Sequence, residues 1–392
     1  MSSITVDCKN LNGAVQVPVS KSILHRYLVC AYVQGDYDAI RNIESKAGQL
    51  ADDVLATKDC LEKMMDAMPG SDEALELNCR ESGTTLRFMI PLVAAMGVKA
   101  DVVAEGSLIG RPMQPFIDEL NRHGANIEMI SSGNAEIYEV SGELEEGDYN
   151  LPGNISSQFV SGLMLASDLV DGDLWICLDD ELESSSYVDM TTQVIHAYGR
   201  GRQDKLIEGD WSCGAMWVVA NDLLGGKLQV GGLSATSIQG DKRIISILND
   251  YAIEELLADE ISIDVSDCPD LVPAIALRAV ASPMVTNITH AGRLRYKESN
   301  RLAAVQEILA ELGADIRIND SGDGLIIKGN AGEKLAGSDK EIDTYGDHRM
   351  VMLAVMTSIL TERAVKIGGI ESVSKSYPRF FEDIRNLGGI VE

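Results

Sequence analysis

Three segments of the chain repeat one pattern of apolar and polar positions. They cover residues 116–129 (FIDELNRHGANIEM), 304–318 (AVQEILAELGADIRI) and 380–392 (FFEDIRNLGGIVE). In each, apolar residues recur at helical spacing, a glycine follows, and a short stretch then alternates like a half-buried strand. A glycine in this place can adopt the left-handed conformation that ends many helices. Each segment is therefore expected to form a helix followed directly by a strand.

The spacing of the glycines indicates internal repetition. A weaker copy of the pattern, VDMTTQVIHAYG, ends at Gly199, which lies 75 positions after Gly124, and Gly388 lies 75 positions after Gly313. Helix–glycine–strand segments also occur in α/β proteins without repeats, so the spacing alone leaves open the alternative of a chain without internal repeats. Repeated amphipathic helices alternating with strands favour two pseudo-symmetric α/β domains.

Length and charge limit the classes of function. The chain of 392 residues is long enough for two domains, and the small polar stretch 231–241 (GGLSATSIQGD) is a candidate boundary. A formal net charge of −28 argues against binding to nucleic acid or to an anionic membrane, because both would be repelled. A small anionic substrate remains possible if its site is locally basic.

The chain shows no sign of export or membrane insertion. No apolar run reaches the eighteen or so residues of a membrane span, and the first residues lack the charged and apolar blocks of a signal peptide. The 7 cysteines are scattered and form no CxxC pair. We therefore expect free thiols in a reducing compartment and a cytoplasmic location.

Basic residues gather beside glycine, serine and threonine, in contrast to the acidic whole. Three such stretches, 20–26, 82–87 and 156–159, have the composition of helix N-termini. The N-terminus of a helix presents free N–H groups and a partial positive charge, and it suits phosphate or carboxylate. Taken singly, a serine in such a place is more often an ordinary N-cap. Together the stretches favour a site for more than one anionic group.

Two carboxylates are candidates for proton transfer. The stretch 293–302 (RLRYKESNRL) places Glu298 among four cations, and Asp270 lies in SDCPDLVPAIAL. Alone, Glu298 could be the partner of an intrahelical ion pair and Asp270 an N-cap. If both face one anion site, they become candidates for acid–base chemistry.

The order of motifs along the chain resembles one family. The motifs, in sequence order, are SKSILHR, SGTTLR, RPM, SSQF, YVDMT, EGDWS, QGD, DCPDLVPA, LRYKESNRL, GDHRMVM and SKSYPRFFED. From about Ile4 to Ile390 the chain resembles the 5-enolpyruvylshikimate-3-phosphate synthases (3-phosphoshikimate 1-carboxyvinyltransferases). The resemblance implies an α/β fold of two pseudo-symmetric domains made of repeated βαβαββ-type units, an inverse α/β barrel with helices inside and sheets outside.

The resemblance also implies a domain division. Residues 1–17 plus 238–392 would form a discontinuous first domain and residues 18–237 a second domain, with the active site in the cleft between them. The implied reaction transfers the enolpyruvyl group of phosphoenolpyruvate to the 5-hydroxyl of shikimate 3-phosphate and releases phosphate, in chorismate and aromatic amino acid biosynthesis. No cofactor and no metal is implied, and a monomer acting on small molecules, without nucleic acid or membrane, is expected.

Residue roles follow from the resemblance position by position. Asp270 resembles the base that takes the 5-hydroxyl proton, Glu298 the acid–base group acting on carbon 3, and Lys21 a lysine that binds phosphoenolpyruvate and assists its chemistry. The residues implied to bind substrate are Lys21, Ser22, Arg26, Gly83, Arg111, Ser156, Ser157, Gln158, Ser184, Asp270, Arg293, Lys297, Arg301, Arg349 and Lys375. Of these, Gly83, Arg111, Arg301, Arg349 and Lys375 resemble the phosphoenolpyruvate clamp, while Ser156, Ser157 and Ser184 resemble the residues holding the phosphate of shikimate 3-phosphate. Arg87 and His348 resemble supporting residues.

The sequence departs from the family pattern at several places. Glu81 stands where many members have asparagine, and SSSY (184–187) replaces a common Ser-Lys-Pro-Tyr. The connections 199–208 and 251–261 are short for the family, and each is expected to remove strands from one repeat unit and to lower stability.

Two other functions stay open. The sister enolpyruvyl transferase acting on UDP-N-acetylglucosamine usually carries a cysteine just before an Arg-Pro, and VVAEGSLIGRPM has none. A non-catalytic relative that only binds ligand would fit the shortened connections and Glu81, but it would have no need for two proton-transfer carboxylates.

Overall fold

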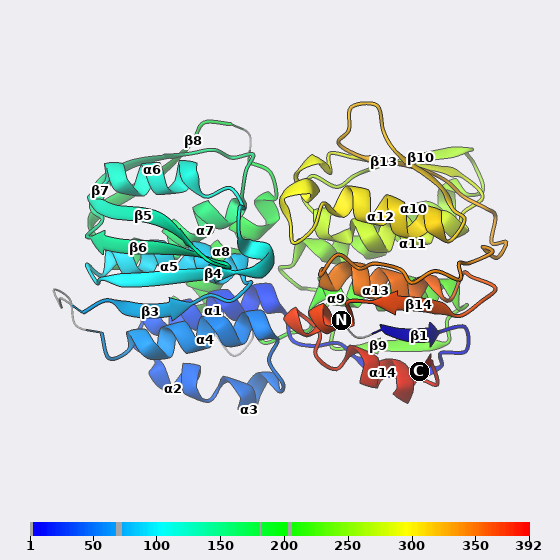
Figure 1. Cartoon of the computed structure of the whole chain (residues 1–392), viewed down its shortest axis with the longest axis horizontal. Coiled ribbons are helices and arrows are strands. Elements are labelled where there is room, and N and C mark those ends of the chain that lie inside the picture. The colour runs from blue at the N-terminus through cyan, green and yellow to red at the C-terminus, as the bar shows by residue number, and fades with distance from the viewer. Residues whose placement is uncertain (1–2, 68–72, 181, 203–205) are drawn as a thin grey trace. The chain divides into compact units, whose positions relative to one another are not determined.

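Two units divide the chain, and each contains its own helices and sheets. The first unit consists of Met1–Pro18 and Gly209–Glu392, and the second of Val19–Glu208. The structure, a computed structural model, describes residues 3–67, 73–180, 182–202 and 206–392 (Figure 1).

The second crossing between the units differs from the expected position. Residues 209–237 were expected in the second domain, but they belong to the first unit. The reason is strand pairing, because β9 (Leu228–Gly231) runs parallel to β2 (Gly13–Gln16), with Gly13 opposite Leu228 and Gln16 opposite Gly231. The small polar stretch 231–241 therefore lies inside the first unit and is not a boundary.

The same four-stranded sheet occurs once in each unit. Its order is β3-β4-β6-β5 in the second unit and β10-β11-β13-β12 in the first. In both sheets the first two strands are parallel and the other pairings are antiparallel. The strands are β3 (Leu75–Asn78), β4 (Ala100–Glu105), β5 (Ala125–Ser132), β6 (Ala135–Gly142), β10 (Glu260–Asp264), β11 (Val285–Thr289), β12 (Asp315–Ile318) and β13 (Leu325–Lys328). The helices between them are α5 (Gly83–Ala95), α6 (Gln114–Arg122), α11 (Val272–Ala281) and α12 (Arg301–Glu311). The expected βαβαββ unit is confirmed.

Three glycines end helices as the sequence pattern predicts. Gly124, Gly313 and Gly388 have φ angles of +91°, +102° and +90°, and strands β5, β12 and β15 (Ile390–Val391) begin within two residues of them. The weaker fourth copy differs, because Gly199 is the last residue of helix α8 (Ser185–Gly199).

Each unit also holds a shortened repeat. It consists of two parallel strands and two helices. In the second unit these are β7 (Glu145–Leu151), α7 (Ser157–Ala166), β8 (Asp171–Leu178) and α8. In the first unit they are β2, α9 (Trp211–Leu223), β9 and α10 (Ile244–Glu254), where the chain of the second unit is inserted between β2 and α9. Within the described residues no hairpin follows α8 or α10. These two-stranded repeats agree with the expectation that the short connections 199–208 and 251–261 remove strands, and residues 203–205 lie outside the described part.

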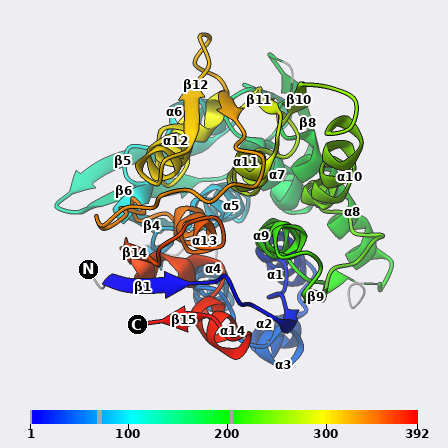
Figure 2. The same ribbon diagram turned by 90° about the vertical axis from the view of Figure 1, so that its right-hand side faces the viewer.

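Helices occupy the interior of each unit and strands the outside. All ten residues of α13 (His348–Thr357) are buried, whereas β4 and β10 alternate between buried and more exposed positions. A helix that is buried all round belongs in a core, and a strand that alternates covers it with one face. Figure 2 shows α9 and α13 of the first unit nearly end-on, with β1 (Ser3–Asp7) and β14 (Val365–Gly368) outside α13.

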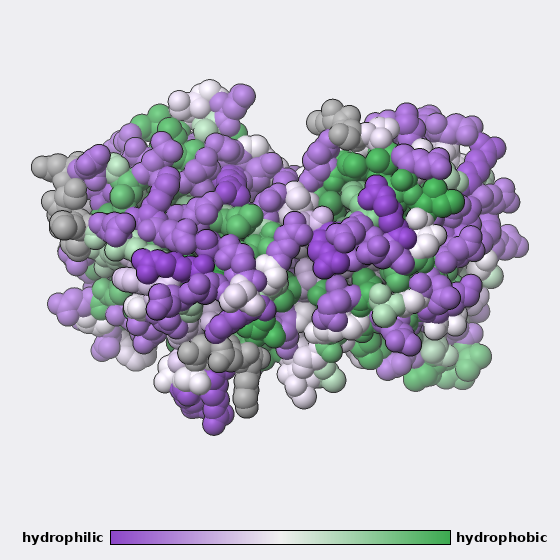
Figure 3. Space-filling model, turned by 90° about the horizontal axis from the view of Figure 1, so that it is seen from below, coloured by the Kyte–Doolittle hydropathy of each residue, from purple (hydrophilic) through white to green (hydrophobic). Residues whose placement is uncertain are grey.

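Helices α1 (Lys21–Val33), α2 (Tyr37–Arg41), α3 (Ile43–Ala47) and α4 (Asp52–Met64) open the second unit, and α14 (Phe380–Asn386) closes the first. Hydrophilic residues cover most of the face seen in Figure 3. Among the described helices none is long and apolar enough to cross a membrane. All seven cysteines are free, and Cys177 is the exposed one.

Candidate active site

The three predicted helix N-termini exist in the second unit. Ser20, Ser82 and Ser156 are the N-caps of α1, α5 and α7, and each hydroxyl accepts a hydrogen bond from a first-turn backbone N–H, at 3.5, 3.2 and 3.2 Å. Ser184 precedes α8 with a φ of +54°, a conformation that residues other than glycine rarely adopt. Such residues are often found at functional sites.

Side chains join the starts of α5 and α7. Gln158 donates through Nε2 to the Thr84 hydroxyl at 2.8 Å and accepts through Oε1 from Arg87 Nη1 at 2.9 Å. The first turns of these two helices, with their free N–H groups, are therefore held beside each other. Ser156 and Ser157 belong to the same turn of α7 as Gln158. This arrangement offers several donors to one anion.

Gly83 lies directly beside two guanidinium groups. A Cβ atom at this position would lie 2.7 Å from Arg87 Nη1 and 3.0 Å from Arg111 Nη1. Arg111 is held by a hydrogen bond from its Nε to the carbonyl oxygen of Ser107 at 3.0 Å. Its Nη2 is buried and has no hydrogen-bond partner among the described residues. The absence of a side chain at Gly83 thus keeps a space next to a cation with unused hydrogen-bonding capacity.

The two basic residues of α1 have different surroundings. Lys21 Nζ lies 2.7 Å from Asp53 Oδ2, and both side chains are mostly buried. Arg26 is buried, and it donates to the Thr191 hydroxyl at 2.7 Å and to the carbonyl oxygen of Tyr187 at 3.1 Å. Burial lowers the pKa of Arg26 to about 10. Arg26 therefore ties α1 to α8, a structural role that the sequence did not indicate.

Glu81 is turned toward a loop. Its Oε2 accepts a hydrogen bond from the backbone N–H of Ser107 at 2.9 Å. Ser107 belongs to the 3-10 turn Gly106–Leu108, and its carbonyl oxygen accepts the hydrogen bond from Nε of Arg111, four residues later. The carboxylate that departs from the family pattern therefore fixes the loop that carries Arg111.

Asp270 is the carboxylate of the first unit with the most cationic surroundings. It lies in the 3-10 turn Pro269–Leu271 before α11. Its Oδ1 is 2.8 Å from Arg301 Nη1 and 3.6 Å from Lys297 Nζ, and its Oδ2 is 3.4 Å from Arg349 Nη2. Burial acts to raise the pKa of Asp270, but these three cations hold it well below its usual range. Asp270 is therefore ionised at neutral pH.

Arg301 connects Asp270 with two further carboxylates. Its Nε and Nη2 donate to Asp347 at 2.7 and 3.2 Å, and Nη2 also pairs with Glu298. Burial acts to lower the pKa of Arg301, but the three carboxylates raise it above its usual value. Arg301 was expected to bind phosphoenolpyruvate. In the structure its guanidinium contacts the carboxylates of Asp270, Glu298 and Asp347, and its role toward phosphoenolpyruvate stays a prediction.

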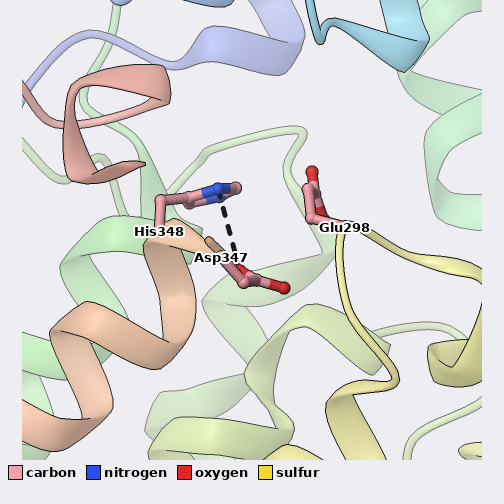
Figure 4. A group of neighbouring side chains, drawn as sticks. All are labelled: Glu298, Asp347 and His348. Atoms are coloured by element: carbon pink, nitrogen blue, oxygen red, sulfur yellow. Dashed lines mark ion pairs between the residues drawn. The ribbon is translucent and has the colours of Figure 1, made fainter. Parts of the chain in front are cut away.

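Glu298, Asp347 and His348 form a small group (Figure 4). Glu298 lies three residues before Arg301, the first residue of α12, whereas Asp347 is the N-cap of α13 and His348 its first residue. One ligand atom of each lies within 4.8 Å of the others. His348 Nδ1 is 3.8 Å from Asp347 Oδ1. Such a group could reach a metal ion, but Arg301 already supplies a positive charge to both carboxylates. A divalent cation would be repelled by it, and the donor set fits a proton-transfer site better than a metal site.

The other predicted residues of the first unit lie on neighbouring loops. Arg293 donates through Nη2 to the carbonyl oxygen of Ser266 at 3.0 Å. Lys375 donates to the carbonyl oxygen of Gly346 at 3.0 Å, immediately before Asp347. Both cations therefore lie on segments next to those that carry Asp270 and Asp347.

Sequence reasoning missed several residues of these two groups. Asp53 pairs with Lys21, Thr191 binds Arg26, and Asp347 accepts from Arg301. Asp241 accepts a hydrogen bond from the Ser212 hydroxyl. Asp347 and Asp241 belong to the GDHRM and QGD motifs that the sequence singled out, so their positions carried a signal, although no role was assigned to them.

The fold of repeated βαβαββ units and the carboxylates held among cations define a class, the enolpyruvyl transferases. The sequence model of the family "EPSP synthase (3-phosphoshikimate 1-carboxyvinyltransferase)" matches residues 6–201 and 198–384. The chain belongs to the EPSP synthase family.

Curated relatives support this over the full length. The 3-phosphoshikimate 1-carboxyvinyltransferase of Clostridium kluyveri is 35% identical over 435 residues, covering 100% of this chain and 99% of the relative. That of Clostridium acetobutylicum is 35% identical over 439 residues, covering 100% and 98%. The alignments are longer than the chain of 392 residues, which agrees with the shortened connections.

Solved structures share the fold. EPSP synthase from Acinetobacter baumannii has a TM-score of 0.71 and 20% identity, with 100% of both chains covered. The enolpyruvyl transferase NikO from Streptomyces tendae has a TM-score of 0.65 and 15% identity, with 100% of this chain and 98% of that chain covered.

Proposed function

We propose that this chain transfers the enolpyruvyl group of phosphoenolpyruvate to the 5-hydroxyl of shikimate 3-phosphate and releases inorganic phosphate. The observation that carries the proposal is the pair of carboxylates on one buried arginine, since Asp270 and Glu298 both contact Arg301. An addition–elimination reaction needs one group to take the hydroxyl proton and another to deliver and remove a proton at carbon 3.

The addition step uses both carboxylates. Asp270 takes the proton of the 5-hydroxyl, and the oxygen attacks carbon 2 of phosphoenolpyruvate while Glu298, in its protonated form, gives its proton to carbon 3. The carbon–carbon double bond is consumed, and a tetrahedral adduct that still carries the phosphate is formed. Lys297 and Arg349 lie 3.6 and 3.4 Å from Asp270, where they favour its ionised form before the reaction.

The elimination step reverses the proton movement at carbon 3. Glu298 removes a proton from that carbon, the double bond forms again, and the bond between carbon 2 and the phosphate oxygen breaks. Phosphate leaves and takes up the proton that Asp270 accepted, so that Asp270 is ionised again, and the enolpyruvyl ether remains on the sugar-like ring. No electrons are gained or lost, so the residues named here supply all the groups that the chemistry requires.

Residues of the second unit would bind the anionic groups of the substrates. We assign Ser156, Ser157 and Ser184 to the phosphate of shikimate 3-phosphate, because hydroxyls and free N–H groups at helix starts favour such a group. We assign Gly83 and Arg111 to phosphoenolpyruvate, since Arg111 Nη2 is buried without a hydrogen-bond partner among the described residues. Lys21 would contact phosphoenolpyruvate after exchanging its present partner Asp53.

The experiment that tests the proposal is phosphate release with different acceptors. Shikimate 3-phosphate and phosphoenolpyruvate together should release phosphate, and neither alone should do so. UDP-N-acetylglucosamine as acceptor should give none. Release that requires UDP-N-acetylglucosamine would identify the sister transferase, and no release from a folded sample that still binds shikimate 3-phosphate would identify a binding relative. The proposed enzyme acts as a cytoplasmic monomer, which sedimentation at working concentrations would check.

A further inference from the structure

Asp241 is a buried carboxylate of the first unit that the proposed reaction does not use. It lies in the 3-10 turn Gly240–Arg243, and only 3% of its surface is exposed. Its Oδ2 accepts a hydrogen bond from the Ser212 hydroxyl at the start of α9. Its Oδ1 has no hydrogen-bond partner among the described residues. A buried carboxylate oxygen in this state costs free energy, so its retention calls for an explanation.

The charges around Asp241 connect it to the proposed base. Burial and the charge of Asp270 raise the pKa of Asp241 to about 7, while Arg349 and Ser212 act to lower it. The neighbouring acidic groups are Asp210, the N-cap of α9, and the thiol of Cys268, whose pKa is raised by burial and by the charge of Asp241. Of the basic residues in its own turn, Lys242 donates to the carbonyl oxygen of Ser237. Arg243 donates to the carbonyl oxygen of Asp264 at 2.8 Å and to the sulfur of Cys268 at 3.7 Å. Because Cys268 is the N-cap of the turn Pro269–Leu271, this contact places the turn of Asp241 against the turn that carries Asp270.

The effect on Asp270 follows from electrostatics. Three cations lie within 3.6 Å of Asp270, and they stabilise its ionised form so strongly that the carboxylate would be a poor proton acceptor. Negative charges oppose this effect. Glu298, which also pairs with Arg301, raises the pKa of Asp270. The buried Asp241, whose own pKa is raised by the charge of Asp270, acts in the same direction, because screening by water is weak there.

We propose that Asp241 is a positioning residue whose negative charge, held by Ser212, keeps Asp270 basic enough to accept the hydroxyl proton despite its three cationic neighbours. This inference rests on the proposed function for the identity of the base. In this role Asp241 acts through Asp270 and not on the reacting atoms themselves. When Asp241 is protonated, Asp270 becomes a weaker base and turnover falls.

The test compares wild type with Asp241→Asn over a range of pH. Asparagine imitates the protonated form and can keep the contact with Ser212. The quantity compared is kcat/KM of wild type divided by kcat/KM of Asp241→Asn. This ratio cancels the titration of the substrates, which is common to both enzymes. We expect the ratio to rise from about 1 near pH 5.5 to on the order of 10 near pH 8.5, less than the roughly 10²–10⁴ expected for loss of a general base. A ratio that is the same at all pH values would reduce Asp241 to a structural role and overturn the proposal.

Two further variants sharpen the comparison. Ser212→Ala removes a group that lowers the pKa of Asp241, so the rise of the ratio should move to higher pH. The matched control is Asp383→Asn, because Asp383 is also a buried carboxylate of the first unit, bonded to the Tyr377 hydroxyl at 2.8 Å. The ratio of kcat/KM of wild type to kcat/KM of Asp383→Asn should not vary with pH.

A measurement without turnover separates this inference from the proposed reaction. Because the pKa of Asp241 is raised in the folded state, its contribution to stability is complete below about pH 4 and is lost as the pH rises through about 7. The melting temperature of Asp241→Asn should therefore equal that of wild type near pH 4 and exceed it above pH 7. In an Asp270→Asn background this transition should move to lower pH, since the charge of Asp270 raises the pKa of Asp241. An unmoved transition would show that the two carboxylates are not coupled and would overturn the inference, whether or not wild type releases phosphate.

Discussion

The guanidinium of Arg301 donates two hydrogen bonds to the fully buried carboxylate of Asp347, from Nε at 2.7 Å and from Nη2 at 3.2 Å. The same guanidinium also meets Asp270 at 2.8 Å. One arginine at the start of α12 thus neutralises carboxylates from the start of α13 and from the turn before α11. The geometry of the proposed proton-transfer groups depends on this residue.

Replacement of Arg301 by leucine should lower the free energy of unfolding by about 3–5 kcal/mol, because it leaves buried carboxylates without their counter-charge. Arg301→Lys should lose less, since it keeps the charge but not the paired donors. Urea denaturation of both variants would measure this. A loss below about 1 kcal/mol for Arg301→Leu would show that the buried cluster does not depend on this arginine.

Replacement of Glu298 by glutamine should lower kcat by roughly 10²–10⁴, because the amide cannot transfer a proton to or from carbon 3. The dissociation constants of both substrates should change little, since glutamine has the same shape. Steady-state kinetics together with calorimetric binding would separate the two quantities. Losses of equal size in binding and in rate would assign Glu298 to substrate binding instead.

Replacement of Arg111 by alanine should raise the KM for phosphoenolpyruvate by about 10–100-fold, which corresponds to the loss of a charge-assisted hydrogen bond of roughly 1.5–3 kcal/mol. The KM for shikimate 3-phosphate should change much less. Glu81→Gln is the companion variant, because it weakens the contact that holds the Arg111 loop through Ser107. It should raise the same KM by a smaller factor. An unchanged KM for phosphoenolpyruvate in Arg111→Ala would refute the assignment of this residue.

Stability should fall in mild acid because of His25. This side chain is fully buried on α1, its Nδ1 contacts the Thr57 hydroxyl at 2.7 Å, and burial together with Lys21 and Arg26 lowers its pKa well below the usual value. The contribution of neutral His25 to the free energy of unfolding is therefore complete above about pH 6.5, the pKa of histidine in the unfolded chain. It is lost as the pH falls toward the pKa in the folded state, at up to about 1.4 kcal/mol per pH unit. In His25→Gln this acid dependence should disappear from the urea midpoint. An identical pH dependence in both proteins would show that His25 does not titrate differently on folding.

The shortened repeat of the second unit should be its least protected part. Strands β7 and β8 form only a two-stranded sheet, and Trp175 on β8 is 63% exposed. Local opening is easiest where few apolar groups are buried. Amides of β7 and β8 should exchange at least about tenfold faster than those of β4 and β6 in native-state hydrogen exchange. Equal protection in both sheets would indicate that the missing hairpin has no energetic consequence.

The repeat could be predicted because it depends on local signals. A glycine after an amphipathic helix and an alternating stretch after the glycine are visible in a single sequence, and Gly124, Gly313 and Gly388 have the positive φ angles that the pattern requires. The second crossing between units could not be located in this way. The pairing of β9 with β2 joins residues more than two hundred positions apart, and the polar stretch 231–241 resembled a boundary although it lies within one unit.

The candidate site was predicted in part. Asp270, Glu298, Lys297 and Arg349 were named from their motifs, and the structure brings them together around Arg301 in the first unit. The partner Asp53 was missed, because a buried carboxylate next to a functional residue has no local pattern that distinguishes it from a surface one. Asp241 lies in the QGD motif, but no role was assigned to it. Arg26 was expected to contact substrate, yet burial and bonds to α8 could be recognised only in three dimensions.

The measurement that tests the central claim most directly is the fate of carbon 3 of phosphoenolpyruvate in deuterated water. Wild type with shikimate 3-phosphate should form an enolpyruvyl product containing deuterium at carbon 3, together with one phosphate per product, as seen by proton and phosphorus NMR. Glu298→Gln should form neither at a comparable rate. A product without deuterium, or no product from wild type that binds both substrates, would contradict enolpyruvyl transfer through the carboxylates around Arg301.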